Sequence, residues 1–398
     1  MRAVVYRGVN DLRVETVPVP RVGANELLVK VAACGVCPTD IKKIQYGTVP
    51  PPRIFGHETA GTIVKIGGNR TNLEFPSPVL RTPSPIRWER AGVRVGDRVA
   101  LHHHVPCLDC HFCRHRAFAQ CETYKRTGIT AGFEPAGGGY AEYVRVMNFV
   151  LPGVVKIPTK NSFEEGAMLE PVNTVLKAVK RLSILRGDVV LVAGQGPVGL
   201  MFTRLLQLRG ANVVATDLLE SRLRLAKKFG AKWTVQVQGP PVFAALRRGK
   251  KSKVQSPRSK MQGKVQSRTL ATLDFGHQTL DAIVIAVPSD EVVRQALQLV
   301  RGGGQVLLFA HTKRSSNLQP STFNLQLSTI CLDEKDLIGS YSSDFTLQDE
   351  VARLVFSRRL DVRDLITHRF GLEQTAAAVA LAAHPTANSL KIMVTQNS

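Results

Sequence analysis

The sequence predicts an α/β protein with a β-rich domain followed by a doubly wound parallel sheet. Its 398 residues are enough for two or three domains. The first 66 residues alternate short apolar runs with proline and glycine, a pattern typical of strands joined by turns. From Gly187 onward, apolar runs of strand length alternate with stretches of helical length, which indicates a parallel sheet covered by helices.

The N-terminal strands should form a barrel-like domain. We expect them at residues 3–6, 26–31, 61–66 and, after a turn, 96–101. Residues 69–91 contain four prolines, which exclude regular structure, so a surface loop is expected there.

The second half of the chain has the strand and helix order of a parallel sheet. Its expected strands are residues 189–192, 212–217, 282–286 and 305–309, with helices ending near 209 and spanning 221–229. An Ala-rich helix at 373–383 and a strand at 390–394 should end the chain.

The chain is strongly basic, with a formal net charge of +22. Nine Lys and Arg residues fall between Arg247 and Arg268 with no acidic residue among them, and removing that stretch leaves +13. Such a polar run buries too little apolar surface to offset its ordering entropy, so residues 246–268 are expected to form a mobile loop. Because the run lacks aromatic residues, any nucleic acid would be bound through its phosphates, and a solvated loop without a partner is the simpler interpretation.

A glycine-rich turn has the sequence of a dinucleotide-binding site. Gly194, Gly196 and Gly199 fit the pattern G-x-G-x-x-G between an apolar strand and a helix. The first permits a tight turn, the second lets the backbone approach a pyrophosphate, and the third lets helix and strand pack closely. Pro197 and Val198 belong to this turn, and the N-terminus of the helix that follows offers N–H groups to the phosphates.

An acidic residue follows this turn at the distance expected of a ribose-binding carboxylate. Asp217 ends the next strand, where it can accept hydrogen bonds from ribose hydroxyls and repel a 2′-phosphate. We therefore expect NAD rather than NADP, although Arg222 and Arg224 could still admit NADP.

Four cysteines cluster within 15 residues and form what we call the knuckle. In a chain without a secretion signal, such a cluster is more often a metal site than a set of disulfides. Four thiolates close a tetrahedral zinc site, so the predicted role is structural. The knuckle consists of Cys107, Cys110, Cys113 and Cys121.

Candidates for a catalytic metal are scattered along the chain. Cys34 and Cys37 follow a strand, His57 and Glu58 precede another, and Glu170 comes just before the second domain. One thiolate, one imidazole and one carboxylate would leave a fourth zinc position for water or substrate. The run of histidines at residues 102–104 is expected on a strand, where alternation would split it between two faces, so we do not expect ligands there.

Together these motifs resemble the zinc-containing medium-chain dehydrogenases, the superfamily of alcohol, polyol and threonine dehydrogenases. The resemblance spans residues 1–394, except for 69–91 and 238–273, which look inserted. It implies a GroES-like β-barrel catalytic domain and a Rossmann cofactor domain. The implied domains are residues 1–168, with a structural zinc lobe at about 102–124, then 169–340 with the basic insert, and 341–398 returning to the catalytic domain.

The resemblance also implies roles for single residues. Cys37 and His57 would bind the catalytic zinc, and Glu58 would approach it during ligand exchange. Glu170 resembles the polyol-dehydrogenase branch, in which glutamate replaces the cysteine of liver-type alcohol dehydrogenases. Thr39 would accept the proton of the alcohol, and Asp40 would fix the tautomer of His57.

The implied function is hydride transfer between a secondary alcohol, such as a polyol, diol or amino alcohol, and NAD. Lys42 stands where many relatives have a histidine, which leaves the final proton acceptor open. We expect a cytoplasmic location, because the sequence shows neither a signal peptide nor a membrane span. The resemblance implies a homo-oligomer, a dimer or tetramer. The alternatives are a zinc-free quinone or enone reductase and a protein that binds anionic surfaces or nucleic acid.

Overall fold

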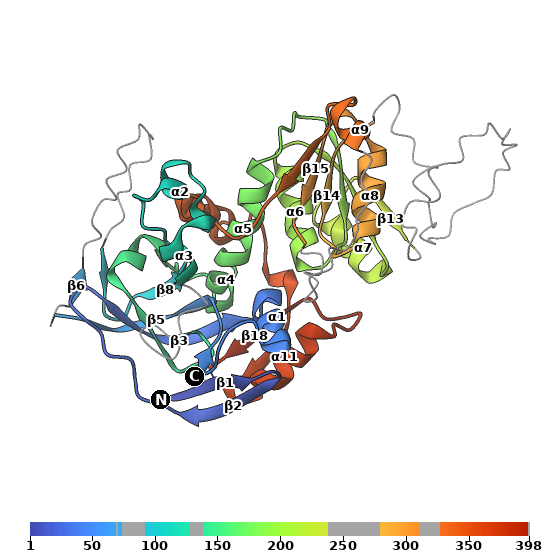
Figure 1. Ribbon diagram of the computed structural model, residues 1–398. Coiled ribbons are helices and arrows are strands. Elements are labelled where there is room, and N and C mark those ends of the chain that lie inside the picture. The colour runs from blue at the N-terminus through green and yellow to red at the C-terminus, as the bar shows by residue number, and fades with distance from the viewer. Residues whose placement is uncertain (69–70, 74–91, 127–137, 238–278, 311–326, 397–398) are drawn as a thin grey trace, which may run out of the picture. The chain divides into compact units, whose positions relative to one another are not determined.

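The computed structural model describes residues 1–68, 71–73, 92–126, 138–237, 279–310 and 327–396. The chain divides into two compact units (Figure 1). Unit 1 comprises Met1–Lys177 and Ser342–Ser398, and unit 2 comprises Ala178–Tyr341. The second boundary lies beside the expected change at residue 341, and the first lies later than the expected change at residue 169.

Unit 1 is built mainly from antiparallel strands around β3 (Leu27–Gly35). The strands β5 (Glu58–Ile66), β9 (Tyr143–Val146) and β18 (Lys391–Thr395) all pair with β3 in antiparallel fashion. Because β18 comes from the C-terminal segment, the end of the chain contributes to the same sheet as its beginning. Other described strands of this unit are β1 (Arg2–Gly8), β2 (Asp11–Thr16), β4 (Arg53–Ile54), β6 (Asn72–Leu73), β7 (Val93–Arg94), β8 (Arg98–Leu101), β10 (Val154–Lys156) and β17 (Ile366–Gly371).

The helices of unit 1 are short and connect or flank these strands. Helix α4 begins with a capping box, in which Ser162 and Glu165 each bond the backbone N–H of the other. Helix α5 contains the boundary between the units. The described α-helices that begin in this unit are α1 (Pro38–Tyr46), α2 (His111–Arg114), α3 (Glu122–Arg126), α4 (Phe163–Ala167), α5 (Leu169–Lys180), α10 (Gln348–Phe356) and α11 (Thr375–Ala383).

Unit 2 contains a six-stranded sheet in the order β13-β12-β11-β14-β15-β16, with every pairing parallel. Helices α6, α7 and α8 pack on this sheet (Figure 1). This is the strand order of a doubly wound fold that binds dinucleotides where the order reverses. Its elements are β11 (Val189–Ala193), α6 (Pro197–Leu208), β12 (Asn212–Asp217), α7 (Glu220–Lys228), β13 (Trp233–Gln236), β14 (Leu280–Ile285), α8 (Asp290–Leu299), β15 (Val300–Leu308), α9 (Leu327–Cys331) and β16 (Asp336–Gly339).

The glycine turn after β11 follows from local sterics. All five residues of β11 are buried, as expected for a strand covered on both faces. Gly194 has a φ of 91°, which favours glycine. A Cβ on Gly199 would lie 1.8 Å from the carbonyl oxygen of Gly194, so only glycine permits this close packing of helix on strand.

Residues 69–91 and 246–268 were both expected to lack regular structure. The basic run at 246–268 lies outside the described residues. Most of residues 69–91 also lies outside them, but β6 falls within this segment and pairs with β7, so that part is regular. Among the described helices, none is long and apolar enough to cross a membrane.

Candidate active site

The knuckle brings together cysteines from the loop before α2 (Cys107 and Cys110), from α2 itself (Cys113) and from the residue before α3 (Cys121). Cys107, Cys110, Cys113 and Cys121 form a group whose sulfur atoms all lie within 4.8 Å of one another. The Sγ of Cys113 lies 3.5 Å from that of Cys110 and 3.9 Å from that of Cys107. Sulfurs bonded to one tetrahedral zinc at about 2.3 Å stand about 3.8 Å apart, so the donor set fits this ion.

Backbone N–H groups in the knuckle favour the thiolate form that a metal needs. The N–H of Cys107 donates to the Sγ of Cys121, and the N–H of Cys110 donates to the Sγ of Cys107. Burial opposes a charged thiolate at Cys121, but the N–H donors of Cys107 and Tyr124 outweigh it and lower the pKa of Cys121 to about 6.

His57 is the central residue of a second group. It precedes β5, is buried, and has its Nδ1 atom 3.3 Å from the Oδ2 atom of Asp40 on α1. Although burial opposes the protonated ring, Asp40 and Cys37 raise the pKa of His57 well above its ordinary value. A carboxylate beside Nδ1 favours a proton on that atom and leaves the Nε2 lone pair for a metal ion.

Glu58 is held by a buried lysine from the other end of the chain. Its carboxylate forms an ion pair with Lys391 of β18, and the Nζ atom of Lys391 also donates to the carbonyl oxygen of Val36 at 2.9 Å. A Cβ on Gly35 would lie 1.8 Å from Glu58 Oε2, so this glycine makes room for the pair. The sequence analysis did not identify Lys391, because nothing near it in the chain marks it.

Helix α1 carries the remaining N-terminal candidates. Cys37 is its N-cap residue and is half-buried, and Thr39 lies in the first turn and is also half-buried. Lys42 is exposed on the same helix, and partial burial lowers its pKa. Cys34 is buried beside the Oγ1 atom of Thr59, and burial raises its pKa to about 12, which keeps this neighbouring thiol protonated.

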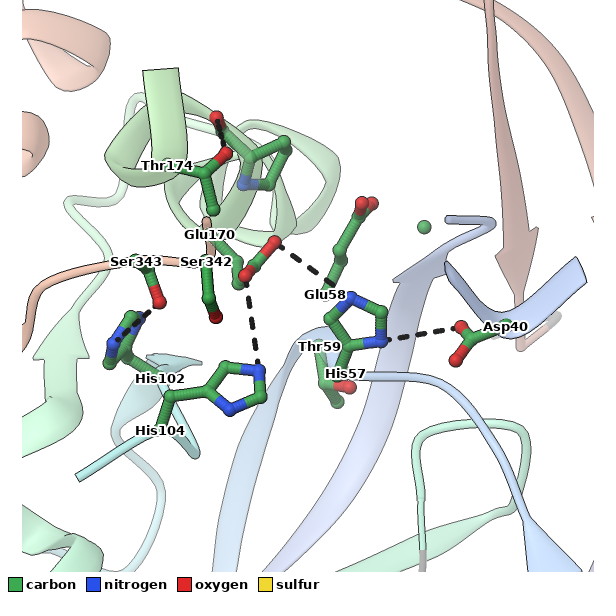
Figure 2. A network of polar contacts seen from close by, with 12 residues as sticks. Asp40, His57, Glu58, Thr59, His102, His104, Glu170, Thr174, Ser342 and Ser343 are labelled. Carbon is green, nitrogen blue, oxygen red and sulfur yellow. Dashed lines mark hydrogen bonds and ion pairs between the residues drawn. The ribbon is translucent and has the colours of Figure 1, made fainter. Parts of the chain in front are cut away.

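Glu170 in the first turn of α5 faces two histidines at once (Figure 2). Its Oε2 atom lies 4.0 Å from Nε2 of His57, and its Oε1 atom lies 4.0 Å from Nε2 of His104. Burial raises the pKa of Glu170 to about 7, the charge of Glu58 adds to this, and His57 opposes it. Burial lowers the pKa of His104 well below its ordinary value, which keeps this ring neutral.

The candidate catalytic ligands form two overlapping groups. Cys37, His57 and Glu58 make one, and His57, His104 and Glu170 make the other, with the ligand atoms of each group within 4.8 Å of one another. His57 therefore stands next to every other expected ligand. Cys37 and Glu170 each meet His57, but in different groups.

The histidine run at 102–104 does not lie on the expected strand, and this removes the reason for excluding it. We did not expect ligands there, because alternation along a strand would divide the three side chains. Strand β8 ends at Leu101, before the run, so alternation does not apply. All three rings are buried, and His102 Nε2 lies 3.3 Å from the Oγ of Ser343 (Figure 2).

Each donor set in unit 1 fits a zinc ion. The knuckle offers four sulfurs, and the two groups around His57 offer sulfur, nitrogen and carboxylate oxygen, the ligands that zinc prefers. The Nε2–O distances of 4.0 Å around Glu170 are too long for hydrogen bonds. They are slightly wider than the separation of about 3.3 Å expected for two ligands bound at about 2.0–2.1 Å to one tetrahedral ion.

The turn in unit 2 fits a dinucleotide. A Cβ on Gly196 would meet nothing within 4 Å, which leaves its backbone open to a ligand. Asp217 at the end of β12 accepts hydrogen bonds from the N–H groups of Gln195 at 2.6 Å and Leu219 at 2.9 Å. Arg222 Nη1 lies 3.9 Å from Asp217 Oδ2, within the same unit. The carboxylate therefore helps to shape the turn, and a carboxylate has acceptor capacity beyond these two bonds.

Comparison with known families shows which proteins share these two domains. Residues 23–159 match the model of the alcohol dehydrogenase GroES-like domain, and residues 197–357 match that of the zinc-binding dehydrogenases. The chain belongs to the medium-chain dehydrogenase superfamily, whose members are oxidoreductases with a GroES-like domain and a Rossmann-like parallel sheet.

Individual relatives narrow the class further. A sorbitol dehydrogenase of Bombyx mori is 28% identical over 398 residues, which cover 98% of this chain and 98% of that protein. A zinc-binding dehydrogenase of Sinorhizobium meliloti 1021, crystallised with NADP, has a TM-score of 0.75 at 24% identity and covers 99% of this chain and 98% of its own. An Escherichia coli structure described as a short chain alcohol dehydrogenase with NADH has a TM-score of 0.76 at 22% identity and covers 99% of both chains. This chain is an oxidoreductase similar to the polyol dehydrogenases.

Proposed function

We propose that this protein transfers a hydride between a secondary alcohol of the polyol class and NAD, with a zinc ion bound beside His57. The observation that carries the proposal is that His57 belongs to both groups of candidate catalytic ligands. Its Nε2 atom faces Glu170 and its Nδ1 atom faces Asp40. The sorbitol dehydrogenases among the relatives support a polyol as substrate.

The residues around His57 have separable tasks in this reaction. Bound zinc would act as a Lewis acid on the substrate hydroxyl, and bound NAD would accept the hydride. Asp40 orients His57, and Lys391 holds Glu58 in a buried ion pair. The Thr39 hydroxyl would take the proton of the substrate, and its place in the first turn of α1, two residues after Cys37, supports this role.

The preference for NAD rests on Asp217. A 2′-phosphate near this carboxylate would meet a negative charge, whereas ribose hydroxyls could donate to it. Arg222 near Asp217 offers a positive charge that favours the opposite outcome, so the two cofactors must be compared directly. Gly194, Gly196, Pro197, Val198 and Gly199 would form the phosphate-binding turn.

A zinc-free quinone or enone reductase is the alternative within the same fold. Such an enzyme has no need for a thiolate, an imidazole and two carboxylates gathered around His57. The grouping of Cys37, His57 and Glu58, and of Glu170 with His57, favours the zinc enzyme.

We further infer a cytoplasmic homo-oligomer. All seven cysteines are free thiols, as a reducing compartment requires. Within the described residues, β16 stands at the edge of its sheet with β15 as its one neighbour, and Leu332 and Leu337 expose apolar surface there. Exposed edge strands with apolar side chains are suited to pairing with another chain, and a second copy of this protein is the proposed partner.

The function is tested with the purified full-length protein, NAD or NADP, and a panel of secondary alcohols that includes sorbitol, xylitol, 2,3-butanediol and threonine. Absorbance of the reduced cofactor should rise with at least one polyol, and faster with NAD than with NADP. Cys37→Ala should lower kcat/KM by about 100-fold or more while the knuckle zinc stays bound, because it removes a metal ligand.

The matched control is Cys331→Ser, which changes an exposed cysteine outside both metal groups and should turn over like the wild type. Normal turnover by Cys37→Ala would refute the assignment of the catalytic metal. A protein that carries two zinc ions but reduces neither cofactor with any compound of the panel would refute the substrate class.

A further inference from the structure

His104 lies in the candidate site without a structural partner for one ring nitrogen. It is buried, and within the described residues its Nδ1 atom has no hydrogen-bond partner. Its Nε2 atom lies 4.0 Å from one oxygen of Glu170, while the other oxygen lies 4.0 Å from His57 Nε2 (Figure 2). One buried carboxylate thus stands between two imidazole nitrogens at equal distances.

These distances point to an ion rather than to a polar network. A hydrogen bond at 4.0 Å does not form, so the two rings and the carboxylate do not satisfy one another. A bound cation would accept the Nε2 lone pairs of both rings and an oxygen of Glu170 at once, a role that no hydrogen bond among the three fills. Two imidazoles and one carboxylate are a donor set that binds zinc with a position left open.

The ring of His104 packs against Tyr124, which follows the knuckle in the chain. Tyr124 stacks on it with ring centroids 5.0 Å apart and an interplanar angle of 24°. The hydroxyl of Tyr124 lies 2.5 Å from the Oγ of Ser342 and 3.2 Å from that of Ser343. Tyr124 lies on α3, which begins directly after Cys121, so the folded knuckle positions the ring that packs against His104.

We propose that His104 is a ligand of the catalytic metal, and that it creates a second binding position made of His57, His104 and Glu170. This position adjoins the one made of Cys37, His57 and Glu58 and shares His57 with it. The inference rests on the proposed presence of a metal beside His57. It adds two statements to the proposed function: His104 supplies a nitrogen ligand, and the position made of His57, His104 and Glu170 needs no thiolate.

A specific consequence concerns the loss of Cys37. If all four of Cys37, His57, His104 and Glu170 bound one tetrahedral ion together, no position would remain for substrate. The two groups would therefore be alternative positions for one ion, and His57, His104 and Glu170 could hold it without Cys37. Cys37→Ser should lose turnover but retain a metal ion, and Cys37→Ser combined with His104→Gln should lose that ion.

The test measures metal binding with Co²⁺ as the probe. The full-length protein keeps zinc in its knuckle, the other ion is removed by dialysis against a chelator, and Co²⁺ is titrated back in competition with that chelator. The visible absorption of bound Co²⁺ reports its ligands, and the titration gives its Kd. Retention of one zinc per chain and an unchanged circular dichroism spectrum confirm that each variant is folded.

His104→Gln should weaken Co²⁺ binding by about 10- to 100-fold or more and change the absorption of the bound ion, because one nitrogen ligand is lost. His104→Asn, measured in parallel, should have the same effect. His103→Gln is the matched control, since it changes a buried histidine one residue away that belongs to neither group, and it should bind Co²⁺ like the wild type.

Wild-type affinity and an unchanged Co²⁺ spectrum in a folded His104→Gln variant would overturn the inference, even if that variant had a raised KM. Loss of the ion from Cys37→Ser alone would also overturn it, because the position without thiolate would then not hold a metal. Failure of the proposed function looks different. In that case Co²⁺ binds as predicted, but no alcohol of the panel is oxidised.

Discussion

A single glycine makes room for the ion pair that holds Glu58. A Cβ on Gly35 would lie 1.8 Å from Glu58 Oε2 and 2.9 Å from Cε of Lys391, so both side chains would have to move. We predict that Gly35→Ala lowers the free energy of unfolding by about 1–3 kcal/mol, as overpacking of a buried site does. Urea unfolding followed by circular dichroism measures the change.

The control is Gly8→Ala, because a Cβ on Gly8 would meet nothing within 4 Å at the end of β1. Equal unfolding midpoints for the two alanine variants would show that the Glu58–Lys391 pair is free to shift, contrary to the close contact described.

At the level of residues, local motifs could be predicted and long-range partners could not. The knuckle spacing and the glycine turn specify their geometry within a few residues, so Cys107 and Gly194 were identified from sequence. Lys391 contacts Glu58 because β18 pairs with β3, and no local sequence pattern predicts that pairing. The position of His104 beside Glu170 was not predicted, because the sequence did not reveal that β8 ends at Leu101.

The capping box of α4 gives a pH-dependent contribution to stability. Burial would raise the pKa of Glu165, but the N–H of Ser162 and the side chains of Arg358 and Asn161 outweigh it and lower that pKa. Because the pKa is lower in the folded than in the unfolded state, the stabilisation is fully present above the unfolded value of about 4.3 and is lost as pH falls through the folded value.

We therefore predict that Glu165→Gln costs about 1 kcal/mol at pH 7, and that the difference from wild type disappears as pH falls below about 4. Unfolding midpoints measured across this range test it. Glu220→Gln, at the exposed start of α7, should have little effect at any pH. A deficit of Glu165→Gln that stayed constant down to low pH would mean that the lost interaction does not depend on the charge.

Strands and helices of unit 2 were the most predictable elements. The buried run of β11 and the alternation of strand and helix specify a parallel sheet, and β12 spans the expected residues 212–217. The edge strand β16 was not predicted, because its residues are mostly exposed and lack the apolar run of its neighbours. The two-residue strands β6 and β7 are too short to leave a periodic signal.

For the whole molecule, the exposed apolar residues beside β16 predict the assembly state. Changing Leu332 and Leu337 together to lysine should convert the proposed oligomer to a monomer, since a buried lysine pair would carry unpaired charge. Sedimentation velocity of the wild type and the double variant measures the mass. The control is Leu185→Lys, which charges another exposed leucine of unit 2 that lies in the loop before β11.

A double variant with the same mass as the wild-type oligomer would place the interface elsewhere. The expected dimer or tetramer could not be assigned from sequence, because assembly depends on which apolar side chains the fold leaves exposed. Substrate identity had the same limit, since the relevant side chains come from separate segments. The two-domain α/β architecture, in contrast, followed directly from the change from punctuated strands to alternating strands and helices.

The most direct test of the account is the location of zinc in crystals of the full-length protein, from anomalous diffraction recorded on either side of the zinc absorption edge. The account predicts two sites per chain, one surrounded by the four knuckle cysteines and one bonded to Nε2 of His57. A single site in the knuckle, with none beside His57, would contradict it.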